Sequence, residues 1–272
     1  MIVRDALLAA SDRLAEVSDT ARLDAELLMA HALGTSREAM LLDALDSPRP
    51  DGFDPLVDRR LTHEPVAYIL GHREFWSLDF QVGPGVLIPR PDSETLIEVA
   101  VDMLTNRPPD SVLDLGTGSG ALLLASLSEW PEARGIGIDS SETALDYARR
   151  NAEQLGLADR AQFRLGNWAE GAAGRFDLIL CNPPYVDPAD ILMPDVADFE
   201  PESALYAADA GLADYREIIP QIANLLADDG IACLELGAGQ SGAVARICAD
   251  QGLKSAVRPD LAGHERCLLI HR

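Results

Sequence analysis

The chain has 272 residues, 47% of them hydrophobic and 25% charged, which predicts a well-cored globular protein of one large domain or of a large and a small one. Its net charge of −23 disfavours binding to the phosphate backbone of DNA or RNA, although it would attract a basic protein at long range. With no apolar run of the ~20 residues that span a bilayer, no signal-peptide pattern and four scattered cysteines, we expect a cytoplasmic protein that contacts neither membranes nor, directly, nucleic acids.

Apolar residues recur at helical spacing through the first part of the chain. Leu7 and Leu14 lie on one such stripe and a second stripe follows it, so residues 1–66 are predicted to form a small helical domain. Gly34 suits the end of the second helix, and Ser36 opens a third. No residue in this part carries catalytic chemistry. Substrate recognition is its functional interpretation, and a purely structural role is the alternative.

The pattern changes at residues 67–90, which we expect to form a hairpin linker. Leu78–Val82 alternates apolar and polar residues, as a half-exposed strand does. The following Gly83–Gly85 is typical of a turn and indicates a hairpin between the two domains. Pro91 then suits a helix start, and this helix is predicted to continue to about Leu104.

Strand and helix patterns alternate from Ser111 to the end of the chain. This alternation predicts that residues 91–272 form an α/β domain with a parallel, doubly wound sheet. The seven predicted strands lie near residues 111–116, 134–139, 161–165, 176–182, 230–237, 254–258 and 265–271.

The first predicted strand runs into a glycine-rich turn, Asp114-Leu115-Gly116-Thr117-Gly118-Ser119-Gly120. Its glycines permit a tight turn and let backbone N–H groups approach a ligand. The G-x-G-x-G spacing differs from the dinucleotide fingerprint, although spacing alone discriminates weakly. Asp114 is a poor neighbour for a pyrophosphate. It suits a cation such as the ammonium group of S-adenosylmethionine, bound directly or through water.

The next two strands also end in polar residues. Asp139 follows the glycine turn by about 20 residues, where an acid can accept both hydroxyls of a ribose; capping the next helix is the alternative. Asn167 and Trp168 end the third strand and could bracket an adenine, with ordinary packing of Trp168 equally compatible. The predicted cofactor-binding residues are Asp114, Gly116, Thr117, Gly118, Gly120, Asp139, Asn167, Trp168 and Asn182.

The fourth strand stops at Asn182-Pro183-Pro184-Tyr185. The prolines end the strand and leave Asn182 at the carboxyl end of the sheet, where ligands bind in open α/β folds. We therefore expect residues 182–185 to bind substrate. The five histidines are expected to be structural or exposed.

The glycine turn followed by Asn-Pro-Pro-Tyr resembles class I S-adenosylmethionine-dependent methyltransferases that act on a planar nitrogen. A narrower resemblance covers nearly the whole chain and points to the bacterial release factor glutamine methyltransferases (the HemK/PrmC family). The segments that carry this resemblance are Asp24–Leu28, Ala67–Gly71, Arg73–Trp76, Leu87–Glu94, Glu200-Pro201 and Ala204-Leu205.

This resemblance implies a Rossmann-like, seven-stranded class I methyltransferase domain with an N-terminal helical bundle and a hairpin linker. It implies methylation of the side-chain amide of the glutamine in the Gly-Gly-Gln motif of class 1 peptide chain release factors, with S-adenosylmethionine as cofactor. A carboxamide nitrogen is a poor nucleophile, and for such a substrate the Asn182 oxygen and the Pro183 carbonyl are suitable acceptors for the N–H bonds, while Tyr185 would pack against the flat amide. With this substrate we expect Asn182, Pro183 and Tyr185 to be catalytic, with no metal. In this family the segment of Arg90 and Glu94 borders the cofactor pocket; a salt bridge across the linker is the alternative. Two positions depart from the family pattern: Ser93 replaces the usual threonine, and Tyr206-Ala207-Ala208 stands where a glycine is expected.

Other functions remain open from the sequence. An adenine-N6 nucleic acid methyltransferase could use the same Asn-Pro-Pro-Tyr, although the negative charge and the lack of a basic recognition segment argue against it. A nucleotide-binding or dehydrogenase-like module is disfavoured by Asp114 and by the otherwise unexplained Asn182. A non-catalytic nucleotide-binding module that keeps the cofactor fold is disfavoured because Asn182–Tyr185 shows no sign of degradation. We expect a monomer.

Overall fold

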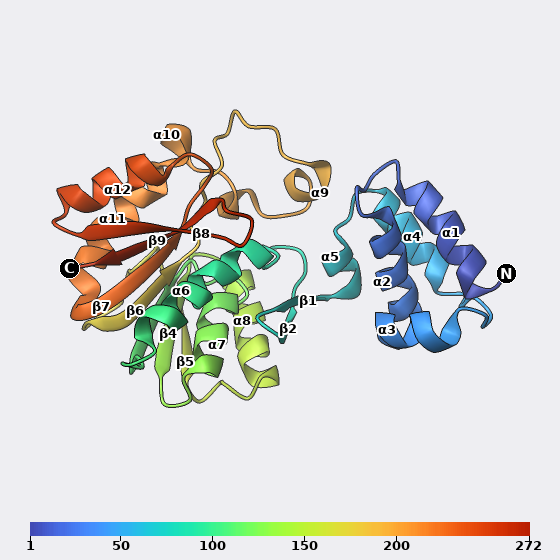
Figure 1. The fold of residues 1–272 in the computed structure, drawn as a ribbon, viewed down its shortest axis with the longest axis horizontal. Helices are drawn as coiled ribbons and strands as arrows, with labels where there is room; N and C mark the ends of the chain where they lie inside the picture. Colours follow the sequence, from blue (N-terminus) through green and yellow to red (C-terminus); the bar gives the residue numbers. More distant parts are fainter. The chain divides into compact units, whose positions relative to one another are not determined.

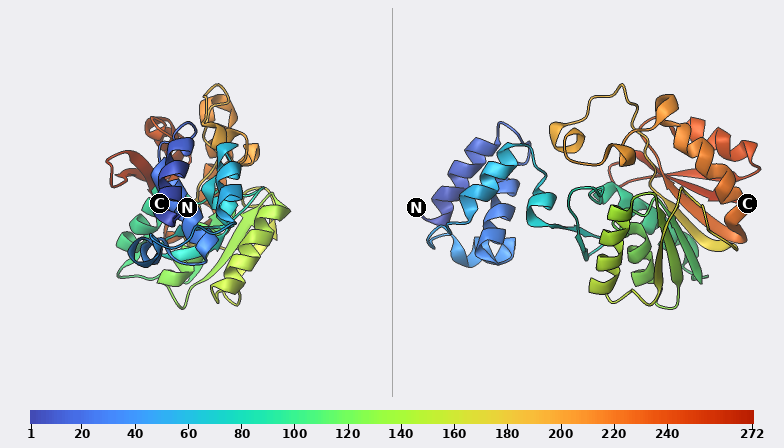
Figure 2. Two further views of the ribbon diagram at one scale, coloured as in Figure 1. Left: turned by 90° about the vertical axis from the view of Figure 1, so that its right-hand side faces the viewer. Right: turned by 180° about the vertical axis from the view of Figure 1, so that it is seen from behind.

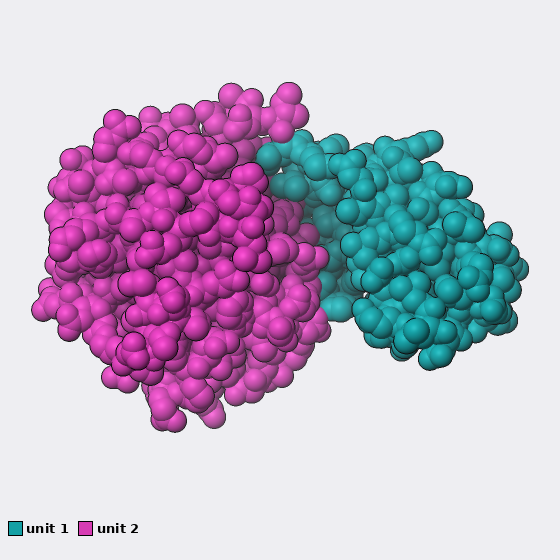
Figure 3. Space-filling view, in the orientation of Figure 1, with its two compact units in different colours: residues 1–72, 192–199 teal, residues 73–191, 200–272 magenta.

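The computed structural model describes residues 1–272, which form two compact units (Figure 3). The first unit contains residues 1–72 and 192–199, and the second contains residues 73–191 and 200–272. Residues expected to form the linker divide between them, since α5 (Val66–Leu70) belongs to the first unit and strand β2 (Leu78–Gln81) to the second. None of the helices combines the length and the apolar character needed to cross a membrane.

The first unit is helical, as predicted. Gly34 takes a left-handed φ of 65° at the end of the second helix, and the Ser36 hydroxyl accepts a hydrogen bond from the Ala39 N–H (3.1 Å) at the start of the third. Both predicted helix boundaries are thus confirmed. The helices of this unit before α5 are α1 (Val3–Leu14), α2 (Ala21–Leu33), α3 (Arg37–Ala39), the π-helical turn η1 (Met40–Ala44) and α4 (Phe53–Leu61).

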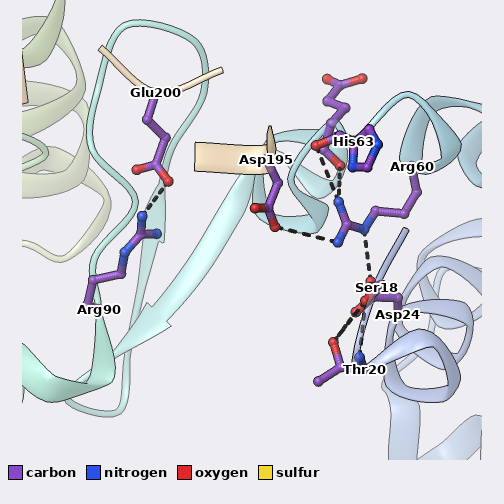
Figure 4. A network of polar contacts seen from close by, with 9 residues as sticks. Ser18, Thr20, Asp24, Arg60, His63, Arg90, Asp195 and Glu200 are labelled. Carbon is purple, nitrogen blue, oxygen red and sulfur yellow. Dashed lines mark hydrogen bonds and ion pairs between the residues drawn. The ribbon is translucent and has the colours of Figure 1, made fainter. Parts of the chain in front are cut away.

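A buried ion pair ties α4 to α2 within this unit (Figure 4). Arg60 Nε donates to Asp24 Oδ2 (2.8 Å), and both side chains are almost fully buried. Asp24 also accepts hydrogen bonds from the hydroxyls of Ser18 (2.8 Å) and Thr20 (2.9 Å). The other end of the guanidinium lies 3.6 Å from Asp195, which joins residues 192–199 to the same unit. Because the paired charges are multiply hydrogen-bonded, the cost of burying them is offset.

The second unit is built on a seven-stranded sheet in the order β5-β4-β3-β6-β7-β9-β8. All seven predicted strands are present, and six of them begin at the expected residue. The seventh, β7, begins at Leu226 because its first residue pairs with Phe176 before a register shift. The first five strands are parallel, and β9 runs antiparallel to both its neighbours. The strands are β3 (Ser111–Leu115), β4 (Arg134–Asp139), β5 (Ala161–Leu165), β6 (Phe176–Cys181), β7 (Leu226–Glu235), β8 (Lys254–Pro259) and β9 (Glu265–His271).

Helices cover both faces of this sheet (Figures 1 and 2). Residues of α6 (Glu94–Leu104) and α7 (Ala121–Glu129) form one core with one face of the strands, and α8 (Glu142–Gln154) packs on the same side. Residues of α11 (Ala213–Leu225) and α12 (Ser241–Asp250) form a second core with the other face. The sheet is therefore doubly wound, as predicted. Short helices η2 (Pro91–Ser93), η3 (Glu202–Ala204) and α10 (Ala208–Gly211) lie in the connections of this unit, whereas α9 (Pro194–Ala197) belongs to the first unit.

The predicted hairpin exists, but its turn was placed wrongly. Strands β1 (His72–Phe75) and β2 pair across Trp76 and Ser77, which both adopt left-handed φ values of 53° and 59°. Two successive positive φ angles match the twist of a tight hairpin. Carboxylates hold these two residues in place, because Glu94 accepts from the Trp76 N–H (2.9 Å) and Glu74 from the Ser77 N–H (2.6 Å). The glycine-rich residues 83–85 follow the hairpin instead of forming its turn.

Candidate active site

A cleft opens where the carboxyl ends of β3, β4 and β6 meet. It contains about 1010 Å³ of empty space, part of it open to solvent, which is sufficient for a cofactor-sized ligand. The segment between β2 and α6 also contributes to its wall through Val86, Leu87 and Arg90. Of the predicted site residues, Gly116, Thr117, Gly118, Asp139, Asn167, Trp168, Asn182 and Pro184 line the cleft, whereas Asp114, Gly120, Pro183 and Tyr185 do not.

The glycine-rich turn is shaped by its own backbone. Gly116 and Gly118 both adopt left-handed conformations, with φ values of 70° and 56°. The N–H groups of Gly116 and Thr117 donate to the Ile138 carbonyl (2.9 and 3.0 Å), and the Gly118 N–H donates to Asp139 Oδ2 (2.8 Å). The turn is therefore attached to the end of β4, and at Gly116 and Gly118 it presents bare backbone to the cleft.

Asp114 lies beneath this turn and not in the cleft wall. It is fully buried, and its Oδ2 accepts a hydrogen bond from the Thr117 hydroxyl (2.6 Å). Burial raises the pKa of Asp114 to about 7, against the opposing effect of the Thr117 bond. The structure thus offers no direct contact between Asp114 and a ligand in the cleft; its carboxylate reaches the lining only through Thr117.

Asp139 faces the cleft directly at the end of β4. One carboxylate oxygen accepts from the Gly118 N–H (2.8 Å) and the other from the Ser141 N–H (2.9 Å). Burial raises the pKa of Asp139, and these backbone donors oppose the shift. The helix cap considered as an alternative role belongs to Ser141, whose hydroxyl accepts from the Ala144 N–H (3.2 Å). A carboxylate offers about four acceptor positions, so Asp139 keeps room for two further donors.

Asn167 and Trp168 form another part of the wall. Trp168 adopts a left-handed φ of 48° and packs against the core beneath α11. Its ring also approaches the glycine turn, since a Cβ added to Gly116 would lie 3.3 Å from it. The Asn167 amide donates to Glu217 Oε1 (2.8 Å). Packing and cleft lining therefore coexist at Trp168.

Asn182 and Tyr185 meet a buried carboxylate that the sequence interpretation missed. Asn182 Nδ2 donates to Ser93 Oγ (3.1 Å), and Ser93 Oγ donates to Glu235 Oε2 (2.5 Å). The Tyr185 hydroxyl donates to Glu235 Oε1 (3.0 Å). Burial and the neighbouring Glu235 charge raise the pKa of Tyr185 well above its usual range. Glu235 could have been recognised, because it ends a strand just as Asp139 does.

Arg90 lines the cleft and also forms a salt bridge, which was the alternative role considered for this residue (Figure 4). Its partner is Glu200, whose side chain is 1% exposed and whose second oxygen accepts from the Ile88 N–H (3.0 Å). Glu200 thereby joins the segment before α6 to residues 201–204, several of which line the cleft. Glu94 serves the hairpin turn instead.

Tyr206-Ala207-Ala208 stands where the family pattern has a glycine, and none of these three residues adopts a left-handed conformation. Val186 and Tyr206 form a parallel bridge, and the Ala207 N–H donates to the Val186 carbonyl (3.0 Å). The left-handed residues come later, at 209–211. Gly211 is required there because a Cβ would lie 2.1 Å from the Tyr185 carbonyl oxygen.

Sequence comparison accounts for both units of the chain. Residues 5–71 match the family described as the PrmC N-terminal domain, and residues 107–264 match a methyltransferase domain family. The release factor glutamine methyltransferase of Rhodospirillum rubrum is 46% identical over 257 residues, covering 92% of this chain and 79% of the relative. The Vibrio cholerae protein of the same name is 42% identical, covering 98% and 96%. The chain belongs to the release factor glutamine methyltransferase family. The Escherichia coli member is 41% identical over 84% of each chain.

Solved structures confirm the class I methyltransferase fold predicted for this family member. The hMettl16 catalytic domain, solved with an RNA hairpin, superposes with a TM-score of 0.60 at 17% identity, covering 77% of this chain and 82% of that one. A Thermus thermophilus 16S rRNA methyltransferase, solved with AdoMet and guanosine, gives 0.53 at 20% identity, covering 74% and 49%. At such low identity these similarities establish the fold alone.

Proposed function

We propose that this methyltransferase transfers a methyl group from S-adenosylmethionine to the side-chain amide nitrogen of the glutamine in the Gly-Gly-Gln motif of class 1 peptide chain release factors. The observation that carries the proposal is Asn182 at the end of β6, in a cleft that also contains the glycine turn and Asp139. Relatives that bear the name release factor glutamine methyltransferase support this choice of substrate.

The residues of the cleft fit S-adenosylmethionine. Asp139 retains acceptor capacity for two ribose hydroxyls, and the glycine turn leaves backbone room for the amino acid portion. Trp168 and the apolar Ile138 offer a surface for the adenine. Asp114 lies below the turn and would act on the ammonium group through Thr117 or water. When bound, this cofactor supplies an electrophilic methyl group on a sulfonium sulfur.

The chain's own residues then have to make an amide nitrogen reactive. Its lone pair is delocalised into the carbonyl, so the nitrogen must be held in line with the methyl group. Asn182 Oδ1 and the Pro183 carbonyl would accept the two N–H bonds and stabilise the positive charge that develops on nitrogen. Tyr185 would fix the plane of the amide. The methylated nitrogen afterwards releases one proton to water, so no general base is needed.

We further propose that residues 1–66 recognise the release factor and that the substrate is a protein, without direct nucleic acid contact, bound by a monomer. The net charge of −23 would attract a basic protein surface and repel a phosphate backbone.

Methyl transfer to defined acceptors tests this function. The protein is incubated with radiolabelled S-adenosylmethionine and, separately, a release factor, the same factor with Gly-Gly-Ala in place of Gly-Gly-Gln, and DNA. Label is expected on the unaltered factor alone. Label on DNA, or equal label on the altered factor, would contradict the proposal.

The Asn182→Ala variant tests the role of the amide at the strand end. Loss of one preorganised partner at a reacting centre costs about 10²–10³ in kcat, so transfer should fall by at least that factor. Calorimetry should find cofactor affinity nearly unchanged. Lost cofactor binding would instead place Asn182 in the cofactor site and not at the substrate.

A further inference from the structure

A buried carboxylate lies at the end of a hydrogen-bond chain that begins at the Asn182 side chain. Asn182 donates to Ser93, and Ser93 donates to Glu235. The second oxygen of Glu235 accepts from the Tyr185 hydroxyl. Glu235 is 1% exposed and does not line the cleft, so its carboxylate reaches the site only through these two hydroxyls.

The direction of this chain follows from the protons that each group can donate. An ionised carboxylate has none, so Ser93 and Tyr185 are both donors to Glu235. A serine hydroxyl has a single proton, and Ser93 directs it to Glu235. Ser93 can therefore only accept from Asn182. The Asn182 side chain must turn its NH2 group toward Ser93, which leaves Oδ1 for the cleft that both residues line.

Shape alone would not select this orientation. The oxygen and nitrogen of a carboxamide are nearly the same size, so hydrogen bonds decide which of them faces a ligand. For methyl transfer to an amide nitrogen, Asn182 has to offer an acceptor to the substrate N–H. A reversed Asn182 would place a donor against a donor and lose the stabilisation of the developing charge.

We propose that Glu235 and Ser93 are positioning residues that hold the Asn182 carboxamide with Oδ1 toward the substrate, and that Glu235 orients the Tyr185 ring through the same carboxylate. The proposal rests on the proposed function, because it assigns the network to transfer onto an amide nitrogen. Burial and the charge of Asp92 raise the pKa of Glu235, and the hydrogen bonds from Ser93 and Tyr185 and the charge of Arg266 oppose part of that rise. A threonine would supply the same hydroxyl at position 93, which explains why serine can replace it.

Two substitutions break the chain at different points. Ser93→Ala removes the hydroxyl that joins Asn182 to Glu235. Glu235→Gln replaces a carboxylate that only accepts by an amide that donates from one side, so either the Ser93 or the Tyr185 hydroxyl must accept a hydrogen bond where it now donates one. Each should lower kcat about tenfold or more, as expected for losing one orienting hydrogen bond, with KM and cofactor affinity within about threefold. Ser93→Thr should keep kcat within about threefold of the unaltered protein. Ser126→Ala is the matched control, because Ser126 is also buried but donates to Leu122 O inside α7.

The double variant Ser93→Ala/Glu235→Gln tests whether the two residues act together. Because Glu235 acts partly through Ser93, the combined loss in kcat should be clearly smaller than the product of the two single losses. Fully multiplicative losses, or kcat within about threefold of the unaltered protein in both folded single variants, would overturn the proposal.

A spectroscopic measurement separates this proposal from the proposed function. The side-chain NH2 resonance of Asn182, assigned by its absence in Asn182→Ala, reports its hydrogen bond without any substrate. It should shift in Ser93→Ala and Glu235→Gln and stay unchanged in Ser126→Ala. If the unaltered protein methylates no release factor, the proposed function fails; if the resonance does not shift in either variant, the positioning role fails.

Discussion

Asp114 should make the free energy of unfolding depend on pH. Burial raises its pKa from the ordinary 3.8 to about 7. The folded carboxyl therefore holds its proton more tightly than the unfolded one, and stability is lost as pH rises between these two values and levels off above the higher one. At about 1.36 kcal/mol per pKa unit, the full effect is about 4 kcal/mol.

The Asp114→Asn variant isolates this contribution, since an amide cannot ionise. Its oxygen can still accept from Thr117, whereas its NH2 group costs about 1–3 kcal/mol wherever it finds no acceptor. The free energy of unfolding of the variant minus that of the unaltered protein should therefore rise by about 2–3 kcal/mol between pH 5 and pH 8. This rise does not depend on which of the two proteins is the more stable at pH 5.

Urea unfolding of the cofactor-free proteins at pH 5, 6, 7 and 8 measures this difference, in which the titration of groups that do not interact with Asp114 cancels. Asp12→Asn, an exposed position, controls for the loss of one charge. A difference that stays constant across this range, or one that favours the variant more at low pH, would refute the raised pKa of Asp114.

Three further substitutions probe the frame of the cleft. Gly211→Ala would place a Cβ 2.1 Å from the Tyr185 carbonyl oxygen and should lower the free energy of unfolding in urea by about 3 kcal/mol or more. Gly239 has the same left-handed backbone but open space around it, so Gly239→Ala should cost only about 1 kcal/mol. Equal costs for the two variants would contradict the steric argument. Glu200→Gln breaks the ion pair of buried Glu200 with the half-buried Arg90 and should lower the free energy of unfolding by about 2 kcal/mol, less than for a fully buried pair. An unchanged denaturation midpoint would disprove this loss. Asp139→Ala should weaken S-adenosylmethionine binding about 10–100-fold by calorimetry, and an unaltered Kd would remove this residue from the proposed cofactor site.

The sheet was predictable because its signals are local. Each of the central strands is a short apolar run that stops at a polar residue or a glycine, and neighbouring strands do not have to be known to recognise it. The hairpin turn carried no such signal, since Trp76 and Ser77 adopt left-handed conformations that their residue types do not favour. Contacts with Glu74 and Glu94 stabilise that turn, and only the folded chain reveals them.

Some residues of the candidate site could be predicted from local sequence patterns, and others are revealed only by the folded chain. Asp139 and Asn182 were found from the sequence because each ends a strand at the edge where ligands bind. The link between Ser93 and Glu235 joins residues 142 positions apart, so no local pattern predicts it. Asp114 was singled out from the sequence as a cofactor-binding residue, but its depth beneath the glycine turn depends on how β3 packs between β4 and β6.

The grouping of residues 192–199 with the helical unit has a practical consequence for dissecting this protein. The chain passes between the units three times, after residues 72, 191 and 199, so no single cut separates them. A shortened protein that begins at Arg73 would keep this segment but lose Arg60, which pairs with Asp195. The segment would then be a free loop whose closure costs entropy, and it ends directly at Glu200, whose ion pair with Arg90 supports the cleft wall. Excising the catalytic unit would therefore loosen the site it is meant to isolate.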